Sequence, residues 1–336
     1  MFTFALFFSH IRMHNAFFTS VELPSTTPKL EVGHPIMVMG SCFSEHIGQR
    51  LSENGMRCDV NPFGVLYNPM SISHALRQVF GSRIYTTDDV ELVEYGGVWH
   101  SLMHHSRFSA PKIEECIKLI NDRLASATLL SQVPGLVLIL TLGTSYVYKY
   151  GSAEGAIVGN CHKMPESCFT RYRLDVESVV KEFRDLIKNV IMPINPTVKI
   201  IFTVSPIRHR RDGMSANTLS KSVLLLAIDQ LVTEMSEYCS YFPAYEIMLD
   251  ELRDYRFYAE DMLHPSSVAV EYIWQRFMEA FFSDTTRRCV KEWQEICKAR
   301  QHRPFNPYSE NYRRFLCQIE LRIKQHKAKY PNFEAE

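Results

Sequence analysis

Two adjacent side chains near the start of the sequence could act as a nucleophile. Ser41 and Cys42 follow Gly40 at the end of a short apolar run, residues 36–39, and an apolar repeat with helical spacing begins at Phe43. A side chain between a strand end and a helix start is exposed on a tight turn, where the positive end of the helix stabilises developing negative charge. The alternative is a simple strand–helix turn, because glycine, serine and cysteine all pack well there.

An acid–histidine pair lies far downstream, in the segment Asp261-Met262-Leu263-His264-Pro265. An Asp three residues before a His can lie on the same side of one turn. Asp261 would then fix the tautomer of the His264 imidazole and stabilise the imidazolium that forms when His264 acts as a general base. A helix-start Asp beside a surface His is the alternative interpretation.

Small polar residues follow the clearest apolar run of the sequence. Gly143, Thr144 and Ser145 come directly after residues 136–142. Their N–H or hydroxyl groups could stabilise the oxyanion of an acyl-transfer reaction. Gly64, in the turn-rich loop 61–69, is another candidate donor, although both segments are also typical of ordinary turns.

Three other polar segments lack an obvious role: the histidine-rich residues 99–106, the group 160–163, and the basic cluster Arg208–Arg211. A metal site can be imagined from Cys161, His162 and Cys168, but its spacing fits no common zinc pattern, so we expect no metal and no other cofactor. The basic cluster is typical of a solvated loop, or it holds an anionic substrate group by bidentate contacts.

The elements that must position these residues alternate between strand and helix. A strand, a tight turn at Gly40 and a helix over 43–51 form the opening unit of a doubly wound sheet. Because the predicted strands lie far apart in the sequence, we expect a mainly parallel sheet covered by helices on both faces. Further strands are predicted at 136–142, 198–204 and 241–247, helices at 70–80, 112–130, 174–191, 215–238 and 266–282, and a hairpin around 95–100.

Composition is that of an ordinary globular protein. The chain has 336 residues, of which 46% are hydrophobic and 22% charged, and its formal net charge is zero, so we expect no nucleic-acid binding. Nine cysteines without a CxxC pair favour a reducing compartment, and we expect a cytoplasmic protein. No apolar stretch approaches the roughly 18 residues that span a bilayer, so no membrane association is expected.

The first residues raise the question of an export signal. The apolar run from Phe2 to Phe8 lacks a positively charged start and a small-residue cleavage site, which argues against one. We expect Met13 to be the true start and residues 1–12 to be a gene-model extension or a disordered N-terminus.

The order of these motifs resembles that of the SGNH hydrolase superfamily, and within it the GSCFA family, whose motif here reads Gly40-Ser41-Cys42-Phe43-Ser44. The resemblance runs from about residue 17 to residue 282. The other segments that carry it are 61–69 with Asn61, 99–101, 104–108 with His105, 141–144, 160–163 with Asn160 and His162, 205–209 with Arg208 and His209, and 261–265.

This resemblance implies a three-layer α/β fold with a doubly wound, mainly parallel sheet of SGNH (flavodoxin-like) architecture, a loop or hairpin insertion and a helical C-terminal tail. Residues 13–284 would form the hydrolase domain and 285–336 the helical extension. Superfamily members usually read Gly-Asp-Ser-Leu at the first block. Alignment without a gap makes Cys42 the nucleophile and a shift by one makes Ser41 the nucleophile; we favour Cys42, because a thiol is the better nucleophile at neutral pH.

A second departure lies at the block that usually reads Gly-x-Asn-Asp. Here it reads Gly143-Thr144-Ser145-Tyr146, so the usual asparagine donor is missing. Ser145, Asn61 or Asn160 could substitute for it, or the oxyanion hole is weaker than in relatives.

The expected function is therefore hydrolysis or transfer of an acyl ester through a covalent acyl-enzyme. The expected partner is a small-molecule or carbohydrate ester, such as an O-acetylated sugar, and the oligomeric state stays open. One alternative is an inactive ester- or carbohydrate-binding module in which the 99–106 loop and Arg208–Arg211 contact the ligand. Another is metal-assisted hydrolysis.

Overall fold

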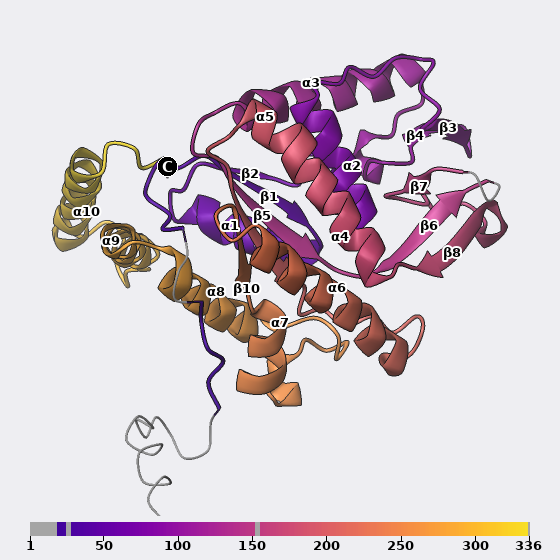
Figure 1. Ribbon diagram of the computed structural model, residues 1–336. Coiled ribbons are helices and arrows are strands. Elements are labelled where there is room, and N and C mark those ends of the chain that lie inside the picture. Colours follow the sequence, from indigo (N-terminus) through magenta and orange to yellow (C-terminus); the bar gives the residue numbers. More distant parts are fainter. Residues whose placement is uncertain (1–18, 25–27, 152–154, 335–336) are drawn as a thin grey trace, which may run out of the picture.

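The centre of the protein is a parallel sheet of five strands (Figure 1). The computed structural model describes residues 19–24, 28–151 and 155–334. The strands lie in the order β10-β9-β5-β1-β2, and every neighbouring pair is parallel. Counted along the chain this order is 2-1-3-4-5, that of flavodoxin-like doubly wound sheets. The strands are β1 (Ile36–Gly40), β2 (Cys58–Val60), β5 (Val137–Leu142), β9 (Lys199–Val204) and β10 (Cys239–Phe242).

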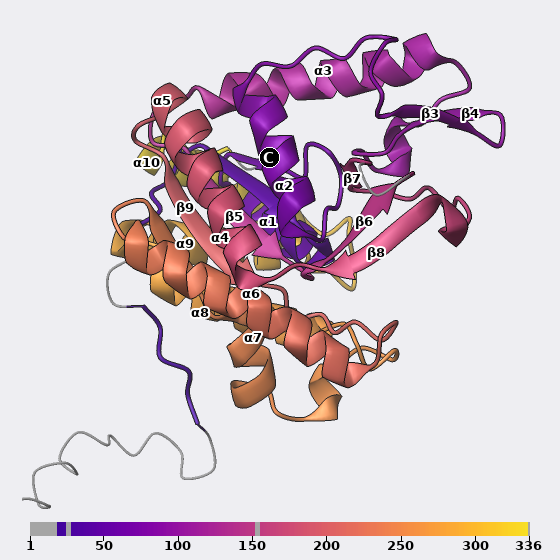
Figure 2. The ribbon, with the colours of Figure 1, turned by 45° about the vertical axis from the view of Figure 1, so that its right-hand side comes forward.

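Helices cover both faces of this sheet, because successive side chains of each central strand point to opposite sides. Met37 and Met39 of β1 pack in one hydrophobic cluster, and Ile36 and Val38 pack in another. The first cluster lies under α2 (Pro69–Phe80), α3 (Ile113–Ser131), α4 (Val176–Asp185) and α6 (Met214–Glu234); the second lies under α1 (Cys42–Glu53) and α8 (Ser267–Phe281) (Figures 1 and 2). The predicted α/β fold with a parallel sheet between helical layers is confirmed.

A hairpin interrupts the alternation after α2, as the sequence predicts. Strands β3 (Leu92–Tyr95) and β4 (Val98–Ser101) pair antiparallel across Gly96 and Gly97. Both glycines have positive φ, 64° and 77°, which a two-residue hairpin turn of this kind requires. The short helix η1 (Ser106–Phe108) follows.

A second small sheet, which was not predicted, grows from the end of β5. It contains β6 (Tyr146–Tyr150), β7 (Ile157–Val158) and β8 (Phe169–Arg173), in the order β7-β6-β8 and all antiparallel, with η2 (Glu166–Cys168) before β8. Figure 2 shows it projecting beyond the edge of the central sheet.

The predicted helix at 174–191 is α4 followed without a break by a π-helical stretch, η3 (Leu186–Ile191), and by α5 (Met192–Ile194).

The strand predicted at 241–247 is confirmed only at its first two residues. Strand β10 ends at Phe242, Pro243 follows, and α7 (Ala244–Glu246) continues into the π-helical η4 (Ile247–Glu251). Ala244, Ile247 and Met248 are fully buried against the second cluster, and their spacing is that of one helix face. The short helix η5 (Tyr255–Phe257) then leads toward the predicted Asp–His segment.

The C-terminal tail is helical, as expected, and docks onto the end of α1. It contains α9 (Asp284–Arg300) and α10 (Glu310–Lys329). The Trp293 indole N–H donates to the carbonyl of Glu53 at 3.0 Å, and the Glu334 N–H donates to the carbonyl of Gly55 at 3.1 Å.

The proposed start at Met13 and the extension 1–12 lie outside the described residues. No helix among the described residues is both long and apolar enough to cross a membrane.

The turn from β1 to α1 leaves no room for a side chain at Gly40. Its φ is +139°, and a Cβ there would lie 2.1 Å from the carbonyl oxygen of Thr141 on β5. The end of β1 therefore passes directly against the neighbouring strand before the chain turns into α1.

Gly40→Ala should destabilise the protein by about 3 kcal/mol or more, because it combines an unfavourable backbone conformation with a clash against backbone. Gly97→Ala is the matched control, since it also has a positive φ but no atom within 4 Å of the added Cβ, and it should cost about 1 kcal/mol. Chemical denaturation of the three proteins measures both values. Equal losses in the two variants would contradict the tight packing at Gly40.

Candidate active site

Ser41 is held inside the turn between β1 and α1. It is the N-cap of α1: its Oγ accepts a hydrogen bond from the Phe43 N–H at 3.3 Å. The same hydroxyl donates to Ser205 Oγ at 3.0 Å, and the residue is only 2% exposed. Ser41 therefore caps the helix and links β1 to the end of β9.

Cys42 is the first residue of α1 and is only partly buried. Its Sγ lies 3.5 Å from the hydroxyl of Tyr67. Burial, together with the neighbouring Cys42, raises the pKa of Tyr67 well above its usual range, so the phenol stays protonated and can donate to a thiolate. The Cys42 N–H, at the helix N-terminus, has no hydrogen-bond partner among the described residues.

Asp261 and His264 form the pair that their spacing predicts. His264 Nδ1 lies 2.5 Å from Asp261 Oδ2. Asp261 Oδ1 also accepts the N–H groups of Leu263 and His264, each at 2.9 Å. These two amides, and then the imidazole, lower the pKa of Asp261 to about 2, so the carboxylate is ionised at neutral pH. Because Nδ1 must donate to this carboxylate, Nε2 is left as the proton acceptor.

Arg208 clamps the loop that carries this pair. Its backbone N–H donates to the carbonyl of Leu263 at 3.2 Å, and its guanidinium donates to the carbonyl of Met262. The guanidinium also lies over the ring of Tyr258, 4.4 Å from the centroid. Met262 has a φ of +60°, which is unusual for a residue with a side chain. The loop is therefore held in a strained conformation by contacts with the segment after β9.

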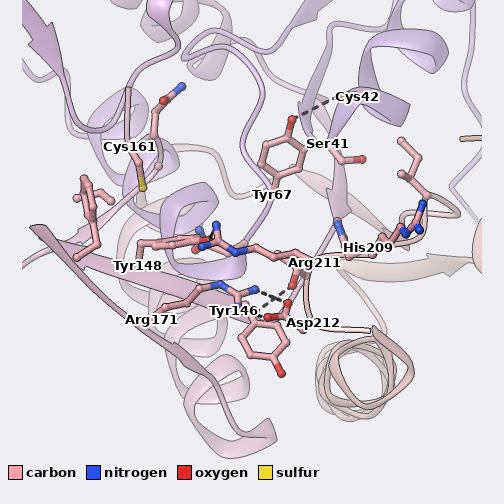
Figure 3. Close-up of a pocket in the computed structure, with 18 of the residues that line it drawn as sticks. Ser41, Cys42, Tyr67, Tyr146, Tyr148, Cys161, Arg171, His209, Arg211 and Asp212 are labelled. Atoms are coloured by element: carbon pink, nitrogen blue, oxygen red, sulfur yellow. Dashed lines mark hydrogen bonds and ion pairs between the residues drawn. The ribbon is translucent and has the colours of Figure 1, made fainter. Parts of the chain in front are cut away.

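A cavity of about 640 Å³ is lined by both Cys42 and His264. It lies beyond the carboxyl ends of β1, β5 and β9, where doubly wound sheets bind ligands. Figure 3 shows Tyr67 turned toward Cys42 on one side of this pocket, and Tyr148, Arg171 and Arg211 on another. The predicted site residues that line it are Ser41, Cys42, Thr144, Asn160, Arg208, His209 and His264.

The backbone amides after β5 are not free to hold an oxyanion. The N–H groups of Gly143 and Thr144 both donate to the carbonyl of Tyr67, at 2.8 and 3.0 Å. Ser145 is fully buried, and its N–H donates to Ser220 Oγ at 2.8 Å. These residues therefore anchor the Tyr67 loop and α6.

Asn61, Gly64 and His105 lie behind the turn and do not line the cavity. Asn61 Oδ1 accepts the Gly40 N–H at 2.9 Å, which orients the β1–α1 turn. Gly64 has a φ of +82°, and a Cβ there would lie 2.2 Å from the Cβ of His105. Their part in the structure is to pack the loop before Tyr67 against η1.

The ring of His162 bonds to groups within the protein, whereas Asn160, which lines the cavity, has a side-chain nitrogen without a partner among the described residues. The ring nitrogens of His162 contact the Ser101 carbonyl at 2.7 Å and Ser106 Oγ at 3.2 Å. Asn160 Oδ1 accepts the His162 N–H at 2.8 Å, and its amide nitrogen makes no hydrogen bond to a described residue. Among the described residues, no group of three or more His, Cys, Asp or Glu side chains could hold a metal ion.

A buried lysine and a neutral histidine support the floor of the cavity. Lys221 on α6 is 1% exposed, and its Nζ donates to the carbonyls of Gly143 and Ser205, both at 2.7 Å. His209 Nε2 donates to the same Gly143 carbonyl at 2.8 Å. Burial lowers the pKa of Lys221 to about 7, and burial, followed by the charge of Lys221, lowers that of His209 to about 4. His209 is therefore uncharged at neutral pH.

Several residues of this site were not singled out from the sequence, among them Tyr148 and Arg171 of the small sheet and also Tyr67, Ser205 and Lys221. Tyr67 and Ser205 both lie in segments that were noted for other reasons, and Ser205 directly follows the predicted strand 198–204. A polar residue at the carboxyl end of a parallel strand is a usable signal. Lys221 offers none, since it reads as an ordinary polar position of a helix.

Asp261→Asn should destabilise the protein in a pH-dependent manner. A carboxyl group whose pKa is lowered on folding contributes stability above its unfolded pKa, and this contribution is lost as the pH falls. The difference in melting temperature between wild type and Asp261→Asn should therefore be constant above about pH 5 and shrink as the pH falls from about 4 toward 2. Differential scanning calorimetry measures it, with the exposed Asp88→Asn as control. A difference that grows toward acid pH would contradict the hydrogen bonding of Asp261.

Comparison with known proteins agrees with the motifs at this site. No curated protein matches the chain. The family model described as the GSCFA family matches residues 35–277, and the model of the GSCFA domain protein, C-terminal domain, matches residues 293–336. The first match covers most of the chain, including the β1–α1 turn, the whole cavity and the Asp261–His264 pair. The protein therefore belongs to the GSCFA family.

Proposed function

We propose that the protein hydrolyses or transfers an acyl ester through a covalent intermediate on Cys42. The observation that carries this proposal is the cavity shared by the Cys42 thiol and by His264, whose ring is held by Asp261 at 2.5 Å. A nucleophile, a base and a group that orients the base are the parts that such a mechanism needs.

In the proposed reaction His264 Nε2 takes the proton of Cys42, and Sγ attacks the ester carbonyl carbon. Collapse of the tetrahedral intermediate breaks the bond to the alcohol oxygen, which receives the proton from His264. Water then attacks the thioester in hydrolysis, and an acceptor hydroxyl does so in transfer. Asp261 holds the ring and stabilises its protonated form.

Cys42 is a better candidate than Ser41 because its side chain is available. The Ser41 hydroxyl is buried, caps α1 and bonds Ser205, whereas the Cys42 thiol is partly exposed and has the Tyr67 hydroxyl as its one hydrogen-bond partner among the described residues. A thiol is also more nucleophilic than a serine hydroxyl near neutral pH.

Two hydrogen-bond donors are suited to the oxyanion. The Cys42 N–H at the start of α1 and the amide nitrogen of Asn160 both lack partners among the described residues. They would replace the amides of Gly143 and Thr144, which are bound to the Tyr67 carbonyl. The loss of those two amides is also the observation that favours the second candidate function, an inactive module that binds an ester or a carbohydrate.

We infer further that the chain is a member of the SGNH superfamily and that a small ester, such as an O-acetylated sugar, is its substrate. The strand order, the nucleophile after the first strand and the Asp–His pair before α8 support the superfamily assignment. All nine cysteines are free, which supports a reducing compartment such as the cytoplasm.

The test is acetylation by p-nitrophenyl acetate, followed by intact-mass spectrometry and peptide mapping. Wild type should accumulate an acetyl group on Cys42 with a burst of nitrophenolate, and Cys42→Ala should lose both. His264→Ala should slow the reaction about 10²-fold to 10⁴-fold, the usual contribution of a general base. Ser41→Ala should still form the adduct, although loss of the helix cap costs about 1 kcal/mol of stability.

Cys161→Ala is the matched control, because Cys161 is the other thiol that lines the cavity. It should react like wild type. Acetylation on Ser41 would overturn the choice of nucleophile. Acetylation that does not depend on His264 would remove the acyl-enzyme mechanism and leave the binding module as the better proposal.

A further inference from the structure

The cavity carries positive charge although the chain as a whole is neutral. Five cationic side chains line it: Lys163, Arg171, Arg208, Arg210 and Arg211. Among the described residues only two acidic side chains, Glu166 and Asp212, accompany them, which leaves an excess of three positive charges. Such a concentration in a concave site attracts anions.

Part of this charge is rigidly placed by aromatic rings. Arg171 on β8 forms a two-pronged ion pair with Asp212, and its guanidinium lies 4.0 Å from the ring centroid of Tyr146. The guanidiniums of Arg171 and Arg211 lie 5.3 and 5.5 Å from the ring centroid of Tyr148 (Figure 3). Stacking of this kind fixes the direction in which a guanidinium can donate.

Arg211 is held by a pair that an incoming anion can replace. Its guanidinium donates to the Tyr148 hydroxyl at 2.5 Å and to Glu166 at 2.6 Å. The side chains of Arg211 and Glu166 are 51% and 85% exposed, and exposed ion pairs contribute little stability. Exchange of Glu166 for a ligand oxygen therefore costs little.

Three of the five cations have no acidic partner among the described residues; of these, Arg208 is already bonded to the carbonyl of Met262, which leaves two. Lys163 and Arg210 are both exposed, line the cavity and make no ion pair with any described residue. Lys163 has a φ of +59°, which places it at a turn beside Asn160. These two side chains can bind a negative group without giving up an existing ion pair.

We propose that this cationic wall, consisting of Lys163, Arg171, Arg210 and Arg211, binds an anionic group of the substrate, a phosphate or a carboxylate. The proposal rests on the proposed function in that the ester carbonyl would lie at Cys42, on another part of the same cavity. Arginine is well suited to this task, because its planar guanidinium matches both anions in bidentate geometry. The substrate class is then a small ester that also carries a negative charge.

The test compares two alkylating reagents on Cys42. In both, the Cys42 thiolate sulfur forms a bond to the CH2 carbon and iodide leaves, but iodoacetate is anionic and iodoacetamide is neutral. Peptide mapping gives the rate at Cys42 and at Cys317, an exposed thiol on α10 that serves as the internal reference. Neither rate requires enzyme turnover, so the measurement is independent of the proposed reaction.

We expect the double variant Lys163→Gln/Arg210→Gln to lower the iodoacetate rate at Cys42 about threefold to tenfold, with the iodoacetamide rate and both rates at Cys317 unchanged. Arg303→Gln, which removes an exposed charge outside the cavity, should change neither rate at Cys42. Inorganic phosphate or acetate should slow the iodoacetate reaction in a saturable way, and the more effective of the two identifies the anion.

An iodoacetate rate that is unaffected by the double variant would overturn the proposal. Equal loss with both reagents would overturn it as well, because that result means altered access to Cys42 and not altered charge. As a second measurement, phosphate or acetate should raise the melting temperature of wild type and not of the double variant; the absence of a shift with both anions also counts against the proposal. If the charge effect is found but no acetyl-enzyme forms, the cationic wall stands and the catalytic proposal fails.

Discussion

The Lys221 side chain links the two chain segments that leave β5 and β9 and line the cavity. Its ammonium group lies inside the protein and donates to the carbonyls of Gly143 and Ser205, which follow the ends of β5 and β9. The small sheet begins just after Gly143, and the arginine-rich segment begins just after Ser205. Burying an ammonium group is unfavourable unless polar groups replace water, and these two carbonyls do so. The Lys221 side chain thus fixes the first residues of the two segments that line the cavity.

The central sheet was predictable because its strands are buried on both faces. Residues 136–142 and 198–204 form continuous apolar runs, and helical spacing marks the segments between them. The run 241–247 was ambiguous, since a short apolar stretch fits either a strand or a helix. Ala244 and Ile247 lie on one helix face and pack into the second cluster, a contact that the sequence alone does not show. The small antiparallel sheet was missed because its strands are short and half-exposed, so their polar and aromatic residues resemble a loop.

The candidate site, like the fold, has parts that could be predicted from the sequence and parts that could not. Asp261 and His264 are three residues apart, and a local turn is enough to bring them together. The hydrogen bonds of the Gly143 and Thr144 amides could not be predicted, because their acceptor is the carbonyl of Tyr67, in a loop far away in the sequence. The same holds for the link between Ser41 and Ser205, which joins residues at the ends of two different strands. Contacts within one turn follow from spacing, whereas contacts between strand ends follow only from the complete sheet.

The two sides of the cavity come from separate pieces of architecture. The thiol and its helix follow a strand of the parallel sheet, while Tyr146, Tyr148 and Arg171 belong to the antiparallel one, whose described side chains are mostly partly exposed apart from the buried Val147 and Val158. Substitutions at these three partly exposed positions can therefore accumulate without disturbing the turn at Gly40 or the packing of the central layers. Within a lineage of such proteins, the aromatic and cationic lining of the cavity and the turn that carries Cys42 are free to change at different rates.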